Sequence, residues 1–97
     1  MQLKDKVIIV TGGGQGLGRA MAEYLAGKGA HLALVDLDQD KLNTAVSACA
    51  SAGVQARAYL CNVANEEQVT QMVAQVATDF GAIHGLVLSG CRPATAE

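Results

Sequence analysis

The feature that most constrains this chain is a glycine-rich segment between an apolar run and a helical segment. Five of the seven residues from 12 to 18 are glycine, and they follow the continuous β-branched run Val7–Val10. Glycine permits a tight turn and lets a ligand approach bare backbone. Free N–H groups at the start of the next helix, together with its dipole, favour an anion such as a diphosphate. The segment therefore predicts a strand, a phosphate-binding loop and a helix in succession.

The spacing of the glycines distinguishes between the known kinds of phosphate loop. G-x-G-x-x-G fits no register, and a Walker A reading from Gly13 places Arg19 where lysine is required. The pattern that fits is G-x-x-x-G-x-G preceded by Thr11. No metal site is expected. The loop residues predicted to contact a nucleotide are Gly12, Gly14, Gln15, Gly16, Leu17 and Gly18.

Strand and helix patterns alternate along the rest of the chain. His31–Val35 and Leu86–Leu88 are apolar runs, and Gln55–Leu60 alternates as a strand near a sheet edge does. A helix is expected at about Leu17–Lys28, and apolar residues recur at helical spacing in two later segments. They are Leu42, Ala45, Val46 and Cys49, and then Val69, Met72, Val73 and Val76.

This β-α-β-α-β-α-β order predicts a parallel sheet, because such crossovers are right-handed. We expect an α/β fold, part of a doubly wound Rossmann domain, with strand order 3-2-1-4 and helices on both faces. Residues 1–90 form the dinucleotide-binding portion, and residues 91–97 an irregular tail. Asn65 is the expected N-cap of the last helix, with Gln68 as its capping-box partner. Left-handed helix ends are expected at Gly29, Gly53 and Gly81.

Asp36 ends the second predicted strand, with Leu37 beside it. In a dinucleotide fold a carboxylate here accepts a hydrogen bond from the ribose 2′-hydroxyl and repels a 2′-phosphate. It favours NAD(H), with NADP(H) the less favoured cofactor. The alternative is a solvated turn carboxylate. A calcium loop starting at Asp36 is rejected, because Lys41 occupies the position that requires glycine.

Bulk properties exclude several classes of function. The net charge is −2 without a basic patch, which argues against nucleic acid, and no apolar run approaches the ~20 residues of a membrane span. Cys49, Cys61 and Cys91 form no C-x-x-C pair and are typical of reduced thiols. A cytoplasmic location is expected.

Thr11–Gly18, Asp36 and the pair Asn62-Val63 together resemble the short-chain dehydrogenase/reductase family, most closely its 3-oxoacyl-(acyl-carrier-protein) reductases. The resemblance extends from about Leu3 to Val87. It implies that Asn62 and Val63 contact adenine. Many of these reductases carry arginine in the loop for an NADP phosphate, where this chain has Gln15.

After Val87 the resemblance breaks. The family has Asn-Asn-Ala-Gly, which lines the cofactor cleft, where this chain reads Leu88-Ser89-Gly90-Cys91; Ser89 and Gly90 take the cleft-lining positions. The family's catalytic Ser, Tyr and Lys would lie beyond residue 97, so no catalytic residue is assigned and truncation is expected. Tyr24 and Lys28 have the Tyr-x-x-x-Lys spacing but sit in the first helix, as a surface or packing pair. His31 and His84 are expected to be structural or solvent-facing.

The function implied by the resemblance is NAD(P)(H)-dependent reduction of a 3-oxoacyl thioester, as in fatty acid biosynthesis. This chain would carry only the cofactor-binding half and be inactive alone. Two alternatives stay open: a non-catalytic NAD-binding module, and an interaction fragment that pairs with an intact reductase. The fourth strand is expected to be an exposed apolar edge, open to self-association or pairing.

Overall fold

The computed structural model describes residues 3–14 and 16–88. Four parallel strands alternate with three helices, and the strand order is β3-β2-β1-β4, which confirms the expected fold and topology. The predicted tail, as well as Gln15, Ser89 and Gly90, lies outside the described residues. Within the described ranges no helix is long and apolar enough to cross a membrane. The elements are β1 (Val7–Thr11), α1 (Gly16–Gly27), β2 (His31–Asp36), α2 (Gln39–Ala50), β3 (Ala56–Leu60), α3 (Glu66–Phe80) and β4 (Gly85–Leu88).

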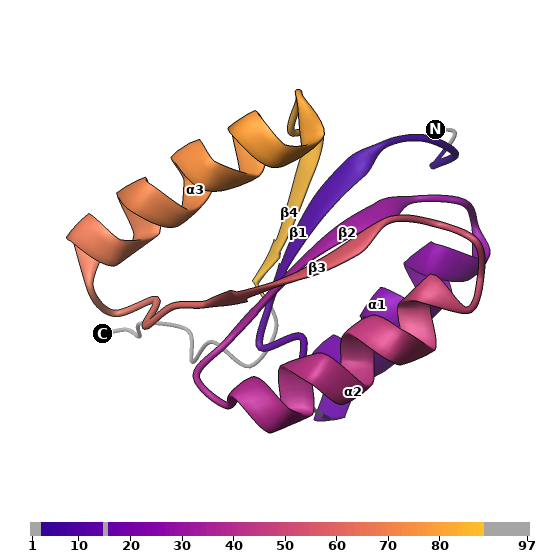
Figure 1. Ribbon diagram of the computed structural model, residues 1–97, viewed down its shortest axis with the longest axis horizontal. Coiled ribbons are helices and arrows are strands. Elements are labelled where there is room, and N and C mark those ends of the chain that lie inside the picture. Colours follow the sequence, from indigo (N-terminus) through magenta and orange to yellow (C-terminus); the bar gives the residue numbers. More distant parts are fainter. Residues whose placement is uncertain (1–2, 15, 89–97) are drawn as a thin grey trace, which may run out of the picture.

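Helices cover both faces of the sheet, with α1 and α2 on one side and α3 on the other (Figure 1). The two central strands are apolar at nearly every position because both of their faces are buried. Their alternate side chains therefore enter two separate cores. One core, under α1 and α2, includes Val10, Leu34 and Leu42; the other, under α3, includes Val35 and Val76, and all five side chains are fully buried.

β3 and β4 form the two edges of the described sheet. The alternating pattern of β3 predicted an edge strand, and this is confirmed. Both histidines lie at strand starts and accept hydrogen bonds from backbone. His31 Nδ1 accepts from the N–H of Gln55 at 3.0 Å, and His84 Nδ1 accepts from the N–H of Val7 at 2.9 Å. Each imidazole therefore ties its strand to a neighbour, which confirms the structural role.

The predicted cap of α3 is confirmed, with a difference in the partner of Gln68. The predicted end of α2 is wrong, because α2 ends at Ala50 with a right-handed C-cap at Ser51, two residues before Gly53. Asn65 Oδ1 accepts from the N–H of Gln68 at 3.0 Å, as a cap should. Gln68 does not return to Asn65, because the Asn65 N–H already donates to the carbonyl of Asn62. The Gln68 side chain accepts instead from the N–H of Asn62 at 2.9 Å. Gly29, Gly53 and Gly81 are left-handed, with φ of 91°, 89° and 84°.

A hydrogen bond between side chains ties α3 to the edge strand β3. The hydroxyl of Tyr59 donates to Asp79 Oδ2 at 2.8 Å, and the Gln75 amide donates to Asp79 Oδ1 at 2.9 Å. These two bonds, the one from Tyr59 first, hold the pKa of Asp79 below its ordinary value. Burial, and then the same bond, raises the pKa of Tyr59. The bond therefore fastens the C-terminal end of α3 to β3.

Tyr59→Phe is expected to lower the urea midpoint of unfolding at neutral pH. The midpoint of the variant should also change less than that of the parent when the pH is lowered. Because the folded-state pKa of Asp79 is depressed, its contribution to stability is present above the unfolded pKa, roughly 3.9. That contribution disappears as pH falls through the folded pKa. The difference between variant and parent should therefore be largest above about pH 4 and shrink below it. Urea titrations from pH 3 to 7 measure this.

Tyr24→Phe serves as the control for this variant. It removes the same hydroxyl from a side chain that is 63% exposed on α1. An equal loss of stability in both variants, or a difference for Tyr59→Phe that persists unchanged in acid, would contradict the role assigned to the Tyr59–Asp79 bond.

Candidate dinucleotide-binding site

The glycine loop leaves the carboxyl end of β1 and enters α1. Gly12 and Gly16 have φ of 69° and 59°, a region that side chains other than glycine rarely adopt. The first turn of α1 contains no acidic residue of its own that would neutralise the positive end of the helix dipole. Thr11, at the end of β1, donates from its hydroxyl to the carbonyl of Val87 at 3.3 Å, which joins the loop's origin to β4. The predicted strand–loop–helix arrangement is confirmed.

The middle of the loop, Gly13 and Gly14, packs against the end of β2. Gly13 and Gly14 are buried, and the Gly13 N–H donates to the carbonyl of Val35 at 3.1 Å. A Cβ at Gly13 would come within 3.1 Å of both Leu34 Cδ2 and the Val10 carbonyl oxygen. The absence of side chains here thus lets the backbone approach the sheet closely and keeps the outer side of the loop bare.

Asp36 lies half-buried at the end of β2, in contact with this loop. Its Oδ2 accepts from the N–H of Gly14 at 3.0 Å, and its Oδ1 accepts from the N–H of Leu37 at 2.7 Å. A Cβ at Gly14 would be only 2.8 Å from Asp36 Oδ2. Sequence reasoning placed Asp36 at the correct strand end but missed these backbone donors, since its spacing from the loop does not reveal them.

The turn after β3 reaches the same edge of the sheet. The N–H of Cys61 donates to the carbonyl of Asp36 at 3.1 Å, which links this turn to the end of β2. Asn62 Oδ1 accepts from the N–H of Ala64 at 2.9 Å, so the Asn62 side chain closes the turn locally. Val63 is 45% exposed and lines the same groove as Thr11.

The structure thus brings most of the predicted site residues to one edge of the sheet. Carboxyl ends of parallel strands are where ligands bind in open α/β sheets. The residues found there are Gly12, Gly14, Gly16, Leu17, Gly18, Asp36, Leu37, Asn62 and Val63. Leu17 and Leu37 are 70% and 66% exposed, so both offer apolar surface at this edge.

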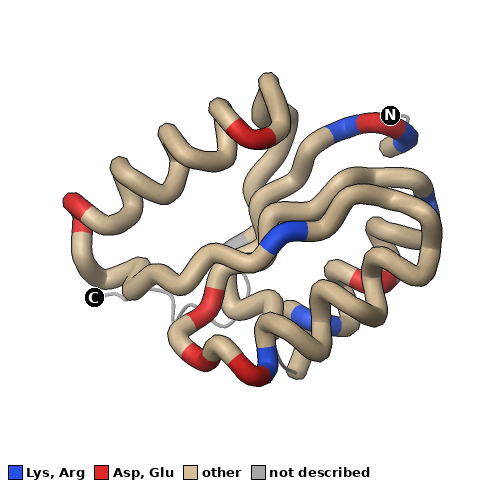
Figure 2. The backbone as a smooth tube through the Cα atoms, in the orientation of Figure 1, with Lys and Arg blue, Asp and Glu red and all other residues tan. Residues whose placement is uncertain are grey.

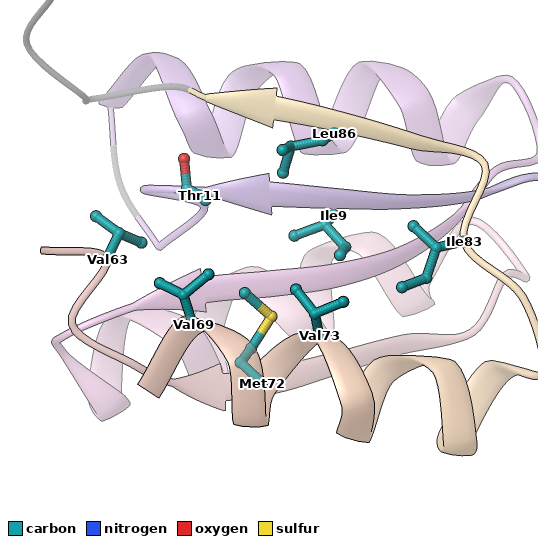
Figure 3. A pocket seen from close by; sticks show the side chains of 8 residues that line it. All are labelled: Ile9, Thr11, Val63, Val69, Met72, Val73, Ile83 and Leu86. Carbon is teal, nitrogen blue, oxygen red and sulfur yellow. The ribbon is translucent and has the colours of Figure 1, made fainter. Parts of the chain in front are cut away.

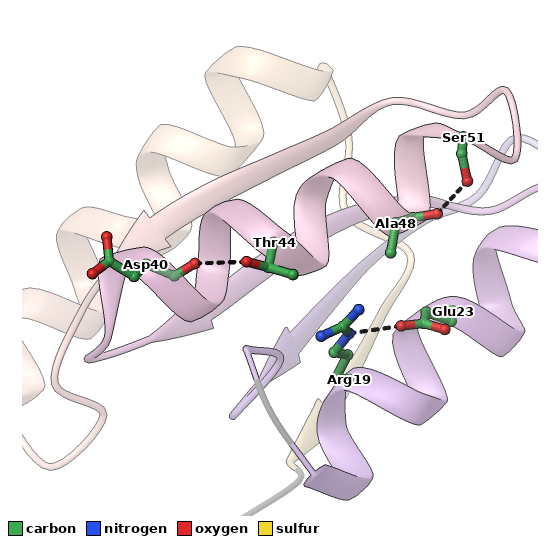
Figure 4. Close-up of polar contacts among 6 residues, drawn as sticks. All are labelled: Arg19, Glu23, Asp40, Thr44, Ala48 and Ser51. Carbon is green, nitrogen blue, oxygen red and sulfur yellow. Dashed lines mark hydrogen bonds and ion pairs between the residues drawn. The ribbon is translucent and has the colours of Figure 1, made fainter.

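A charged hollow of about 280 Å³, which sequence reasoning missed, adjoins the loop between α1 and α2. It is lined by Gly14, Arg19, Asp40, Lys41 and Thr44. Figure 4 shows the Arg19 side chain on α1, paired with Glu23 at 2.7 Å, beside α2. A Cβ at Gly14 would lie 3.2 Å from Lys41 Cβ, so the hollow and Asp36 flank the same glycine. The sequence signal was the position of Arg19 and Lys41 in the first turns of their helices.

Other chemically active side chains lie elsewhere. Lys28 Nζ, one residue past the end of α1, is 5.5 Å from the centroid of the Tyr24 ring, which confirms a surface or packing pair. Cys49 and Cys61 are free and buried, and burial raises the pKa of the Cys49 thiol to about 11. Within residues 3–14 and 16–88, no group of three or more His, Cys, Asp or Glu is arranged to hold a metal ion.

Comparison with known proteins identifies dehydrogenases as relatives of this chain. A family model described as short chain dehydrogenase matches residues 6–95. The 2,5-dichloro-2,5-cyclohexadiene-1,4-diol dehydrogenase of Sphingobium indicum is 41% identical over 91 residues, which are 94% of this chain and 35% of that protein.

Two solved structures share both fold and sequence with the chain. An NAD⁺-bound xylitol dehydrogenase superposes with a TM-score of 0.85 at 40% identity, over 89% of this chain and 33% of that one. A dehydrogenase from Burkholderia phymatum in complex with NAD gives 0.84 at 34% identity, over 89% and 31%. The chain therefore spans about a third of the length of the relatives it matches.

Proposed function

Because the chain belongs to the short chain dehydrogenase family, we propose that it binds the adenosine diphosphate part of a nicotinamide dinucleotide, NAD(H) in preference to NADP(H). The observation that carries the proposal is the Asp36 carboxylate against a bare glycine loop at the N-terminus of α1. The loop and helix would hold the diphosphate, and Asp36 would accept from the ribose hydroxyls. Two NAD complexes among the matching structures support this cofactor.

Residues at the same edge of the sheet would make the contacts to the adenine ring. Leu37 follows β2 and Val63 follows β3, its neighbour in the sheet, and both present exposed apolar surface that suits contact with an adenine ring. Gln15, Ser89 and Gly90, outside the described residues, belong to the proposed site on the sequence pattern alone.

For the whole protein we propose hydride transfer between the nicotinamide and an alcohol or its carbonyl counterpart. The bound cofactor supplies the hydride chemistry, and the protein supplies binding and orientation. The matching dehydrogenases are named for a cyclic diol and for xylitol, so an alcohol is better supported than the 3-oxoacyl thioester expected from the sequence. The 97 residues by themselves would give no turnover, because Tyr59 is bonded to Asp79 and Tyr24 packs with Lys28, both away from the loop.

Titration of the 97-residue chain with NADH and, separately, NADPH tests the proposal through the change in nicotinamide fluorescence. Saturable binding that is tighter for NADH supports it. Absence of saturation with either cofactor contradicts it. Tight NADH binding without turnover also fits the alternative of a non-catalytic NAD-binding module.

A second candidate function, self-association through β4, has its own observation. Val69, Met72 and Val73 of α3 face Ile9 and Leu86 across an apolar groove of about 300 Å³ (Figure 3). Val73, expected to face the core, is instead 39% exposed, and Leu86 is 57% exposed, because both line this open groove.

The two sheet edges differ in charge, which favours β4 as the edge that pairs. β3 carries the exposed Arg57, a charge of the kind that blunts edge strands, whereas β4 carries none along its described length (Figure 2). With a net charge of −2, two copies repel only weakly. We propose that two copies of this chain pair through β4, as an isologous dimer.

Leu86→Lys is expected to convert such a dimer to monomer, since it places a charge in the groove beside the pairing edge. Leu60→Lys is the matched control, because Leu60 is 60% exposed on the opposite edge strand. Sedimentation velocity at several concentrations measures the oligomeric state. A monomeric parent chain, or equal dissociation by both variants, would overturn pairing through β4.

A further inference from the structure

Asp36 makes contacts that nucleotide binding alone does not require. Its two carboxylate oxygens accept from two backbone N–H groups, those of Gly14 and Leu37, at 3.0 and 2.7 Å. Its own carbonyl accepts from the Cys61 N–H at 3.1 Å. The residue therefore joins the glycine loop, the end of β2 and the turn after β3, which are the three segments of the proposed site.

The loop needs such a restraint because of its composition. Glycine loses more conformational freedom on ordering than any other residue, and the loop contains several in succession. The Gly13 N–H is bonded to the Val35 carbonyl, so the carboxylate bond to Gly14 fixes the next peptide in the same direction. With both bonds in place, the Gly13 and Gly14 peptides are held against the end of β2 before any ligand arrives.

We propose that Asp36 is a positioning residue for the phosphate-binding loop, in addition to the ribose contact assigned to it above, on which this inference rests. A carboxylate has about four acceptor positions, and the two backbone donors use two of them. The other two remain for ribose hydroxyls. Asp36 thus holds the loop through one set of lone pairs and the sugar through another.

The two roles of Asp36 predict opposite results for a nucleotide without ribose hydroxyls. If Asp36 only binds the sugar, its removal takes one negative charge away from an anion, so 2′,3′-dideoxy-ADP should bind Asp36→Ala as well as the parent or better. If Asp36 positions the loop, the same variant should bind 2′,3′-dideoxy-ADP more weakly. We expect roughly fivefold weaker binding, the equivalent of one ordinary hydrogen bond.

Asp38→Ala is the matched control. Asp38 lies two residues further on, carries the same charge, and likewise accepts from a backbone N–H, that of Lys41 at 3.1 Å. It caps α2 and has no bond to the loop among those described. Its removal should therefore leave 2′,3′-dideoxy-ADP binding equal or slightly tighter.

The experiment combines calorimetric titrations of ADP and 2′,3′-dideoxy-ADP with hydrogen exchange of the Gly14 amide in the nucleotide-free chain. Weaker dideoxy binding and faster Gly14 exchange in Asp36→Ala, but not in Asp38→Ala, support the proposal. Unchanged or tighter dideoxy binding with unchanged Gly14 exchange overturns it. If Asp36→Asn has to replace an unfolded Asp36→Ala, its NH₂ group takes the place of one of the two oxygens, so the N–H of Gly14 or of Leu37 loses its acceptor and should exchange faster.

Failure of the proposed function is distinguishable from failure of this inference. A parent chain that binds neither ADP nor its dideoxy analogue contradicts nucleotide binding. Gly14 exchange in the free chain then decides the positioning role by itself, since that measurement involves no ligand.

Discussion

Leu34→Ala is expected to destabilise the chain by about 3 kcal/mol, the usual order for a fully buried leucine in a close-packed core. Leu34 has no exposed surface and packs in the core under α1 and α2. A domain of this length has a total stability of roughly 5–15 kcal/mol, so the loss is a large fraction of it. Urea unfolding followed by circular dichroism should show a midpoint lower by roughly 1–2 M.

The same substitution connects the core to the site. Gly13 rests on the Leu34 side chain, where a Cβ would be 3.1 Å from Leu34 Cδ2. A cavity at Leu34 therefore removes the side chain against which Gly13 packs. Nucleotide affinity should then fall even where the chain remains folded. Leu60→Ala, on the exposed side of β3, should change stability by no more than about 0.5 kcal/mol. A loss below about 1 kcal/mol for Leu34→Ala would show that the core relaxes around it.

The second large effect concerns cofactor choice. Asp36→Ala is expected to shift the ratio of the NADPH and NADH dissociation constants by about 10- to 100-fold toward NADPH. The variant loses the acceptor for the ribose 2′-hydroxyl and the charge that repels a 2′-phosphate. Arg19 and Lys41 keep their positive charges in the hollow beside Gly14. Any weakening of the loop acts on both cofactors equally, so it cancels in the ratio.

Fluorescence titrations of parent and variant with both cofactors give this ratio. Asp38→Ala removes a neighbouring charge that makes no hydrogen bond to the described residues of the loop, and it should leave the ratio close to that of the parent. If the ratio is the same in the parent and in Asp36→Ala, another residue sets the preference, and Lys41 becomes the next position to vary.

Much of this molecule could be predicted from local sequence. The positions of the strands, the helices and the loop follow from patterns only a few residues long, and the strand order follows from the doubly wound fold that their alternation predicts. The β-branched run Val7–Val10, the cap at Asn65 and the left-handed Gly81 each specify their own backbone through steric limits and local hydrogen bonds. The short connections then leave few topologies open. For the same reason the strand end that carries Asp36 was identified correctly.

Contacts between segments distant in the sequence could not be predicted in this way. The bond from Gly14 to Asp36 spans 22 residues, and the bond from Val7 to His84 spans 77. One local contact also differed from the prediction: Gln68 does not bond Asn65, because the Asn65 N–H donates to the Asn62 carbonyl. Arg19 and Lys41 came together only when α1 and α2 packed side by side. The sequence by itself therefore determined which backbone each segment adopts, because that depends on neighbouring residues. The tertiary structure alone decided which distant residues bond to one another and which side chains line the same hollow or groove. These contacts depend on how the sheet and the helices pack.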